Sequence, residues 1–173
     1  QNSKTKLNAA DIQVSCINKV NTMNSKLNTA AIAWLKNTEW ELAITVTFRT
    51  GCSERRARKT MSRWLNELDK KFYGYGVRKE NKRFERVVVK HMGRQKDHLH
   101  YHIAAKRPKN KEISKSKFLA LAKFTWEKLS SAGHQNTFKE VYDSEGWLGY
   151  ILGEMEKDNI DIIDEGLTYL IEQ

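Results

Sequence analysis

The sequence predicts an α+β domain of split βαβ order, in which an antiparallel sheet of about five strands carries helices on one face, behind an N-terminal helical extension. Three observations support this fold. Apolar residues alternate over 42–48, they recur at helical spacing over 54–72, and a polar connection at 93–96 separates two further strand-like runs. The order strand, helix, strand, strand, helix, strand is that of a split βαβ sheet, whose other face would be open to hold a site.

The first predicted strand and helix occupy 41–48 and 54–72. Leu42, Ile44 and Val46 alternate with small or polar residues, as in a half-buried strand. Ser53 is a good N-cap for the helix, which should end near the glycines at 74 and 76. The polar face of this helix is strongly basic and carries Arg55, Arg56, Arg58, Lys59 and Arg63.

The later elements follow from the same patterns. Two strand-like runs within 83–105 are joined around Gly93, so they predict a β-hairpin. Ser114 or Ser116 can cap a second helix. The rest of the chain predicts a strand at 137–142, a helix at 146–158 and a last edge strand at 159–164.

The N-terminal segment 1–40 shows apolar residues at steps of three and four, which indicates a helix or a broken pair of helices. We expect it to be a packing arm laid across a domain that covers 41–173, so that the 173 residues form one compact unit.

The composition limits the class of partner. A formal net charge of +10 favours a polyanion, and nucleic acid is the first candidate, because each cation that meets a phosphate releases a condensed counterion. No apolar run is long enough to span a bilayer, and no secretory signal is recognisable. Cys16 and Cys52 have no metal-ligand spacing, so we expect a reducing, cytoplasmic location without a membrane partner.

Three of the five histidines alternate within one predicted strand. His98, His100 and His102 would share one face of the sheet, where neutral imidazoles are good ligands for a divalent metal. His91 on the partner strand of the hairpin could add a cross-strand donor, and Glu85 is a weaker candidate. The alternative is that these histidines are only polar surface.

A single tyrosine is placed to supply a nucleophile. Tyr150 lies in the predicted helix 146–158, beside Trp147. A phenol that attacks a phosphodiester forms a covalent phosphotyrosine link, and a metal can stabilise the charge that develops. The alternative for Tyr150 is core packing on an amphipathic helix.

Together, these motifs resemble the HUH endonucleases of the single-tyrosine, rolling-circle replication-initiator (Rep) type. Residues 44–48, ITVTF, resemble the first motif of that superfamily, 98–105, HLHYHIAA, the His-hydrophobic-His motif, and 149–155, GYILGEM, the tyrosine helix. The order of elements agrees from residue 41 to about 164.

The resemblance implies that 41–173 is a nuclease domain that nicks and transfers single-stranded or hairpin DNA at a replication origin, with Mg²⁺ or Mn²⁺ as cofactor. Tyr150 would stay joined to the 5′ end and leave a 3′ hydroxyl for a polymerase. The replicon would be a plasmid, a phage or an integrated element, with a host helicase and polymerase as further partners. A relaxase or transposase of the same superfamily remains an alternative, as does a non-catalytic RNA-recognition-like (RRM-like) binding module with the same split βαβ order.

Two departures from the family pattern affect the site. Either His98 and His100 or His100 and His102 satisfy the histidine motif; we favour the second pair because an unbroken apolar run follows it. Many members carry a lysine three residues after the tyrosine, where this chain has Gly153. Lys157, two helical turns beyond Tyr150, could replace it.

The predicted DNA contacts are basic residues at strand ends and loops, together with one aromatic residue that could stack on unpaired bases. They are Arg78, Lys79, Lys82, Arg83, Lys106, Arg107 and Trp147.

Overall fold

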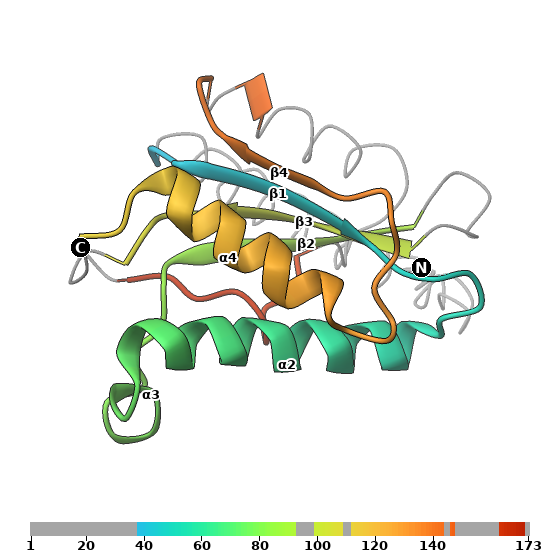
Figure 1. Cartoon of the computed structure of the whole chain (residues 1–173), viewed down its shortest axis with the longest axis horizontal. Helices are drawn as coiled ribbons and strands as arrows, with labels where there is room; N and C mark the ends of the chain where they lie inside the picture. The colour runs from blue at the N-terminus through green and yellow to red at the C-terminus, as the bar shows by residue number, and fades with distance from the viewer. Residues whose placement is uncertain (1–37, 93–98, 109–111, 144–145, 148–162, 172–173) are drawn as a thin grey trace, which may run out of the picture.

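A four-stranded antiparallel sheet with strand order β2-β3-β1-β4 forms the centre of the protein, and helices α2 and α4 cover one of its faces (Figure 1). The structure, a computed structural model, describes residues 38–92, 99–108, 112–143, 146–147 and 163–171. The predicted α+β class with helices packed on an antiparallel sheet is confirmed.

The described elements follow the predicted order, with one short helix added after the first long one. Their bounds are β1 Leu42–Thr47, α2 Glu54–Tyr73, α3 Gly76–Lys79, β2 Arg86–Met92, β3 Leu99–Ala105, α4 Lys115–Glu127 and β4 Thr137–Glu140. The proposed N-terminal extension lies almost entirely outside the described residues, so the division at residue 40 stays a prediction.

Local capping fixes both long helices. The Ser53 hydroxyl accepts a hydrogen bond from the backbone N–H of Arg56 (3.4 Å), and α2 ends at Gly74, whose φ of +53° favours glycine. Of the two serines that could cap the later helix, Ser114 is the N-cap and accepts from the backbone N–H of Lys117 (3.3 Å).

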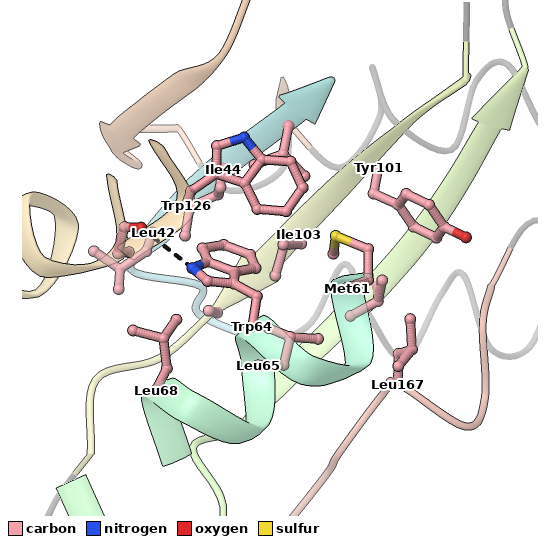
Figure 2. Packing of buried hydrophobic residues seen from close by; sticks show 14 of the residues in the cluster. Leu42, Ile44, Met61, Trp64, Leu65, Leu68, Tyr101, Ile103, Trp126 and Leu167 are labelled. Carbon is pink, nitrogen blue, oxygen red and sulfur yellow. Dashed lines mark hydrogen bonds between the residues drawn. The ribbon is translucent and has the colours of Figure 1, made fainter. Parts of the chain in front are cut away.

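The core lies between the helices and the sheet (Figure 2). Trp64 of α2 and Trp126 of α4 are both fully buried and meet edge to face, with ring centroids 5.0 Å apart. The Trp64 indole N–H donates to Thr125 Oγ1 (3.0 Å), so its polar atom is satisfied inside the core. Leu42 and Ile44 of β1 contribute the sheet side of this cluster, as their alternation predicts.

The strand register decides what the other face of the sheet carries. Because β3 pairs with both β1 and β2, Thr45 lies opposite His102, and His91 lies opposite His100. Alternation then places these four side chains on the face away from α2 and α4.

Residues 163–171 run antiparallel along the outer edge of β2. Ile163 bridges Val89, Tyr169 bridges Arg86, and the Thr168 hydroxyl accepts from the backbone N–H of Val88 (3.1 Å). Only the end of the predicted fifth strand at 159–164 is described, and it forms isolated bridges rather than a strand. The segment nevertheless covers an edge that would otherwise expose unpaired backbone groups.

A buried ion pair connects α2, β2 and this last segment. Asp69 receives two hydrogen bonds from the guanidinium of Arg86, at 2.9 and 3.0 Å, and a third from Arg83 at 3.1 Å. The Arg86 Nε–H donates to the carbonyl of Leu167 (3.0 Å). Because Asp69 and Arg86 are both buried, the pair holds three separate segments at one point.

Among the described residues, no helix is both long and apolar enough to cross a bilayer.

Candidate metal centre and nucleic-acid cleft

His91, His100 and His102 form a cluster on the sheet face opposite the helices. One ring nitrogen from each residue lies within 4.8 Å of the others. His91 Nδ1 and His100 Nε2 are 3.0 Å apart, and the rings of His100 and His102 meet edge to face at 4.9 Å. The predicted cross-strand approach of His91 to His100 is confirmed by the register of β2 and β3.

The donor set fits a divalent metal ion. Nitrogen ligands sit about 2.0–2.1 Å from such an ion, so two of them on one ion are roughly 3.0–3.4 Å apart, which is the separation of His91 and His100. Three imidazoles leave further coordination positions for a phosphate oxygen or water. Mg²⁺ prefers oxygen ligands, whereas nitrogen donors bind transition ions, so of the two expected ions Mn²⁺ fits the cluster better.

His102 is less accessible than an open sheet face predicts. Only 4% of the residue is exposed, and Trp147 lies against it edge to face, with ring centroids 5.6 Å apart. Burial, and then the neighbouring His100 and His91, lower the pKa of His102 to about 3. The imidazole is therefore neutral near pH 7 and keeps the lone pair that a metal ligand needs.

Thr45 on β1 orients His102. Its Oγ1 hydrogen-bonds His102 Nδ1 (2.9 Å), which directs Nε2 of the same ring away from β1. Hydrogen bonds of this kind fix the tautomer and ring angle of histidine ligands. Thr45 is thus a positioning residue for the cluster.

We expect Thr45→Val to weaken Mn²⁺ affinity and nicking by roughly 10–100-fold, the usual effect of losing such a support. Thr45→Ser keeps the hydroxyl and should stay near wild type. Mn²⁺ titration followed by thermal unfolding measures the affinity, and the nicking rate is measured in parallel. Equal behaviour of the two variants would show that the hydroxyl does not orient His102.

A cleft of about 1300 Å³ opens beside the cluster. His100, His102 and Trp147 line it, together with Lys139 of β4 and Arg49, which follows β1. Both basic side chains are exposed, so they can meet phosphates of a strand that lies in the cleft.

The loop 131–136 forms one wall of the cleft because it is fastened to the end of β1. Gly133 N–H donates to the carbonyl of Thr47 (2.8 Å), and the Asn136 side chain accepts from the Thr47 N–H (2.9 Å). A Cβ at Gly133 would lie 2.9 Å from the Thr47 carbonyl carbon, so only glycine fits this close approach. His134, the next residue, is exposed and lines the cleft.

Several predicted site residues lie outside the described residues: His98, Tyr150 and Lys157. Their roles stay predictions. The helix predicted at 146–158 is described only at its start, where Gly146 and Trp147 are helical.

The predicted basic DNA contacts lie at the other end of the sheet from the histidines. Lys82, Arg83, Lys106 and Arg107 surround a smaller hollow of about 260 Å³. Arg107 binds Glu41 through two side-chain hydrogen bonds of 2.8 and 3.1 Å, and Lys106 pairs with Glu85 at 3.3 Å. Arg78 and Lys79 are exposed on α3. Contact of this group with DNA stays a prediction.

Sequence reasoning missed Thr45, Arg49, Gly133 and Lys139 as parts of the site. Alternation along β1 puts Thr45 on the histidine face, so a signal for it was present in the pattern. No local pattern links residue 133 to β1, because that contact joins positions far apart in the sequence.

A family model described as a replication-associated protein of the ORF2 kind matches residues 41–159, about two thirds of the chain. The chain therefore belongs to this family of replication-associated proteins. Membership indicates a role in the initiation of replication and binding to DNA at an origin. Comparisons with curated proteins and with solved structures gave no match.

Proposed function

We propose that the protein is a metal-dependent HUH endonuclease of the single-tyrosine type. It nicks single-stranded DNA, keeps the cut end as a 5′-phosphotyrosine and so initiates rolling-circle replication of a plasmid, phage or integrated element in the cytoplasm. The observation that carries this proposal is the cluster of His91, His100 and His102 beside a basic cleft, in a chain of a replication-associated family.

His100 and His102 form the central ligand pair of this proposal, with His91 as the third donor and His98 as a further candidate. Both central residues lie on β3, an inner strand that is hydrogen-bonded on both sides, so their positions are fixed before DNA binds. When bound, Mg²⁺ or Mn²⁺ offsets the negative charge that develops on the scissile phosphate.

Tyr150 acts as the nucleophile. Its phenolic oxygen forms a bond to phosphorus as the bond from phosphorus to the 3′ oxygen breaks, and the proton lost by the phenol is balanced by the one gained at the 3′ hydroxyl. The phosphoester bond is exchanged rather than hydrolysed, so the step is reversible and the strand can be passed to another 3′ hydroxyl. Lys157 supports the phosphate, in place of the lysine that Gly153 replaces.

The cleft positions the strand. Arg49 and Lys139 contact phosphates, and Trp147, already packed on His102, offers a face on which an unpaired base stacks next to the cluster. A host helicase and polymerase would then extend the released 3′ end.

The deciding experiment is formation of an SDS-resistant adduct with a hairpin or origin oligonucleotide in Mn²⁺. The label should move with the protein when it is on the 3′-side fragment, because that fragment carries the 5′ phosphate. Tyr150→Phe should abolish the adduct. Tyr142→Phe is the matched control, since Tyr142 is 95% exposed and lines the same cleft.

An adduct that survives Tyr150→Phe, or disappears with Tyr142→Phe, would contradict the assignment of the nucleophile. No adduct on any origin or hairpin substrate, despite tight binding, would favour the RRM-like binding module. A relaxase or transposase would form the adduct but would use an origin of transfer or a transposon end as its substrate.

A further inference from the structure

The solvent face of α2 carries three cations that the proposed nicking site does not use. Arg55, Lys59 and Arg63 follow one another at i, i+4 and i+8, about 6 Å apart along the helix axis, and are called here the α2 basic row. All three are exposed, whereas Met61 and Trp64 on the other side of the helix are fully buried.

The α2 basic row has no carboxylate partner among the residues that the structure describes. Neighbouring charges on the same helix are paired elsewhere. Arg58 binds Asp164 through two hydrogen bonds of 2.8 and 3.0 Å, and Glu54 pairs with Lys90 of β2. The row is therefore left as a strip of uncompensated positive charge.

Such a strip is unfavourable to the helix that carries it. Like charges at i and i+4 repel, and Arg55 and Lys59 lie in the first half of the helix, where cations oppose the macrodipole. Lys70 and Lys71, by contrast, lie in the last turn, where the dipole favours them. Local rules broken without an internal compensation are typical of a binding surface.

We propose that the α2 basic row binds the phosphate backbone of duplex DNA without reading its base sequence. The row spans roughly 12 Å, and a duplex presents one phosphate per about 1.7 Å of axis, so each cation can meet a phosphate. α2 packs on the face of the sheet opposite the histidines, so this surface is separate from the cleft (Figure 1). The inference rests on the proposed function only in taking origin DNA as the partner.

The test measures binding of a blunt duplex of about 20 base pairs by fluorescence anisotropy between about 50 and 200 mM salt. Arg55→Gln, Lys59→Gln and Arg63→Gln are combined, since glutamine keeps helix propensity. Loss of three phosphate contacts should lower the slope of log K against log salt by about 2.7. Wild type should then lose about forty-fold more affinity than the variant over this range.

The control removes the same charge from α4 and its C-cap by combining Lys117→Gln, Lys123→Gln and Lys128→Gln, all exposed residues. It should keep the wild-type slope. If both triple variants lower the slope equally, or neither does, the proposal is overturned, because net charge or another surface then binds the duplex.

Nicking of an unstructured single strand separates the two proposals. The α2 variant should form the Tyr150 adduct with such a strand as wild type does, and equal loss of both activities would overturn a separate duplex surface. A wild-type protein that forms no adduct but shows the difference in slope contradicts the proposed nicking and supports the α2 basic row.

Discussion

Replacing His100 and His102 with alanine should reduce DNA cleavage by roughly 10²–10⁴-fold. The estimate follows from the several kcal/mol that a bound metal contributes to a transition state of this kind, at about 1.4 kcal/mol for each factor of ten. Cleavage rates under single-turnover conditions measure the effect. The single variant His100→Ala is the cleaner one, because His102 is buried and its removal also leaves a cavity and an unpaired Thr45 hydroxyl.

The same variants should lose metal binding, which is measured without any DNA. Mn²⁺ at about one hundred times its dissociation constant should stabilise the wild type by about 2.7 kcal/mol, a rise in the unfolding temperature of roughly 5–11 °C. His91→Ala should lose this rise as His100→Ala does. His134→Ala is the control and should retain it, since this exposed histidine lies outside the cluster.

His98 tests the choice of ligand pair. If His100 and His102 are the central pair, His98→Ala should have a smaller effect on cleavage than either. Normal cleavage by the His100 and His102 double variant would exclude the cluster as the catalytic metal site.

The second large effect concerns stability. Asp69→Leu should lower the free energy of unfolding by about 3–5 kcal/mol, because it leaves the buried Arg86 guanidinium without a counter-charge. For a domain of this size, that is a fall of roughly 6–20 °C in the unfolding temperature, measured by calorimetry or circular dichroism. The Asp69→Leu, Arg86→Met double variant should recover much of the loss, since it buries no unpaired charge at position 86.

An exposed ion pair gives the matched control. Glu80 and Lys82 lie 2.6 Å apart with about half of each side chain exposed, and Glu80→Gln should cost less than about 1 kcal/mol. A loss of similar size from Asp69→Leu would mean that the buried pair does not hold α2, β2 and the 163–171 segment together.

Local patterns predict the histidine strand well. Alternation in 98–105 places His100 and His102 on one face, and the short hairpin connection brings His91 opposite, because a hairpin pairs strands that are adjacent in sequence. The basic face of α2 is likewise visible in the spacing of its arginines and lysines.

Contacts between distant positions could not be predicted in this way. Thr45 meets His102 across 57 residues because β1 pairs with β3, a choice that depends on the packing of the whole sheet. The burial of His102 depends on Trp147, which comes from another part of the chain. The same holds for Asp69 and Arg86, which single-sequence periodicity treats as unrelated charges.

The attachment of 163–171 to β2 also affects how the chain folds. The contacts of Arg86 and Val88 with this segment close loops of about 80 residues, and such non-local pairing slows folding. During synthesis, β2 can pair with β3 long before residue 163 leaves the ribosome. The outer edge of β2 therefore stays open to other strands in the interim, so the nascent chain is most exposed to aggregation just before its last segment docks.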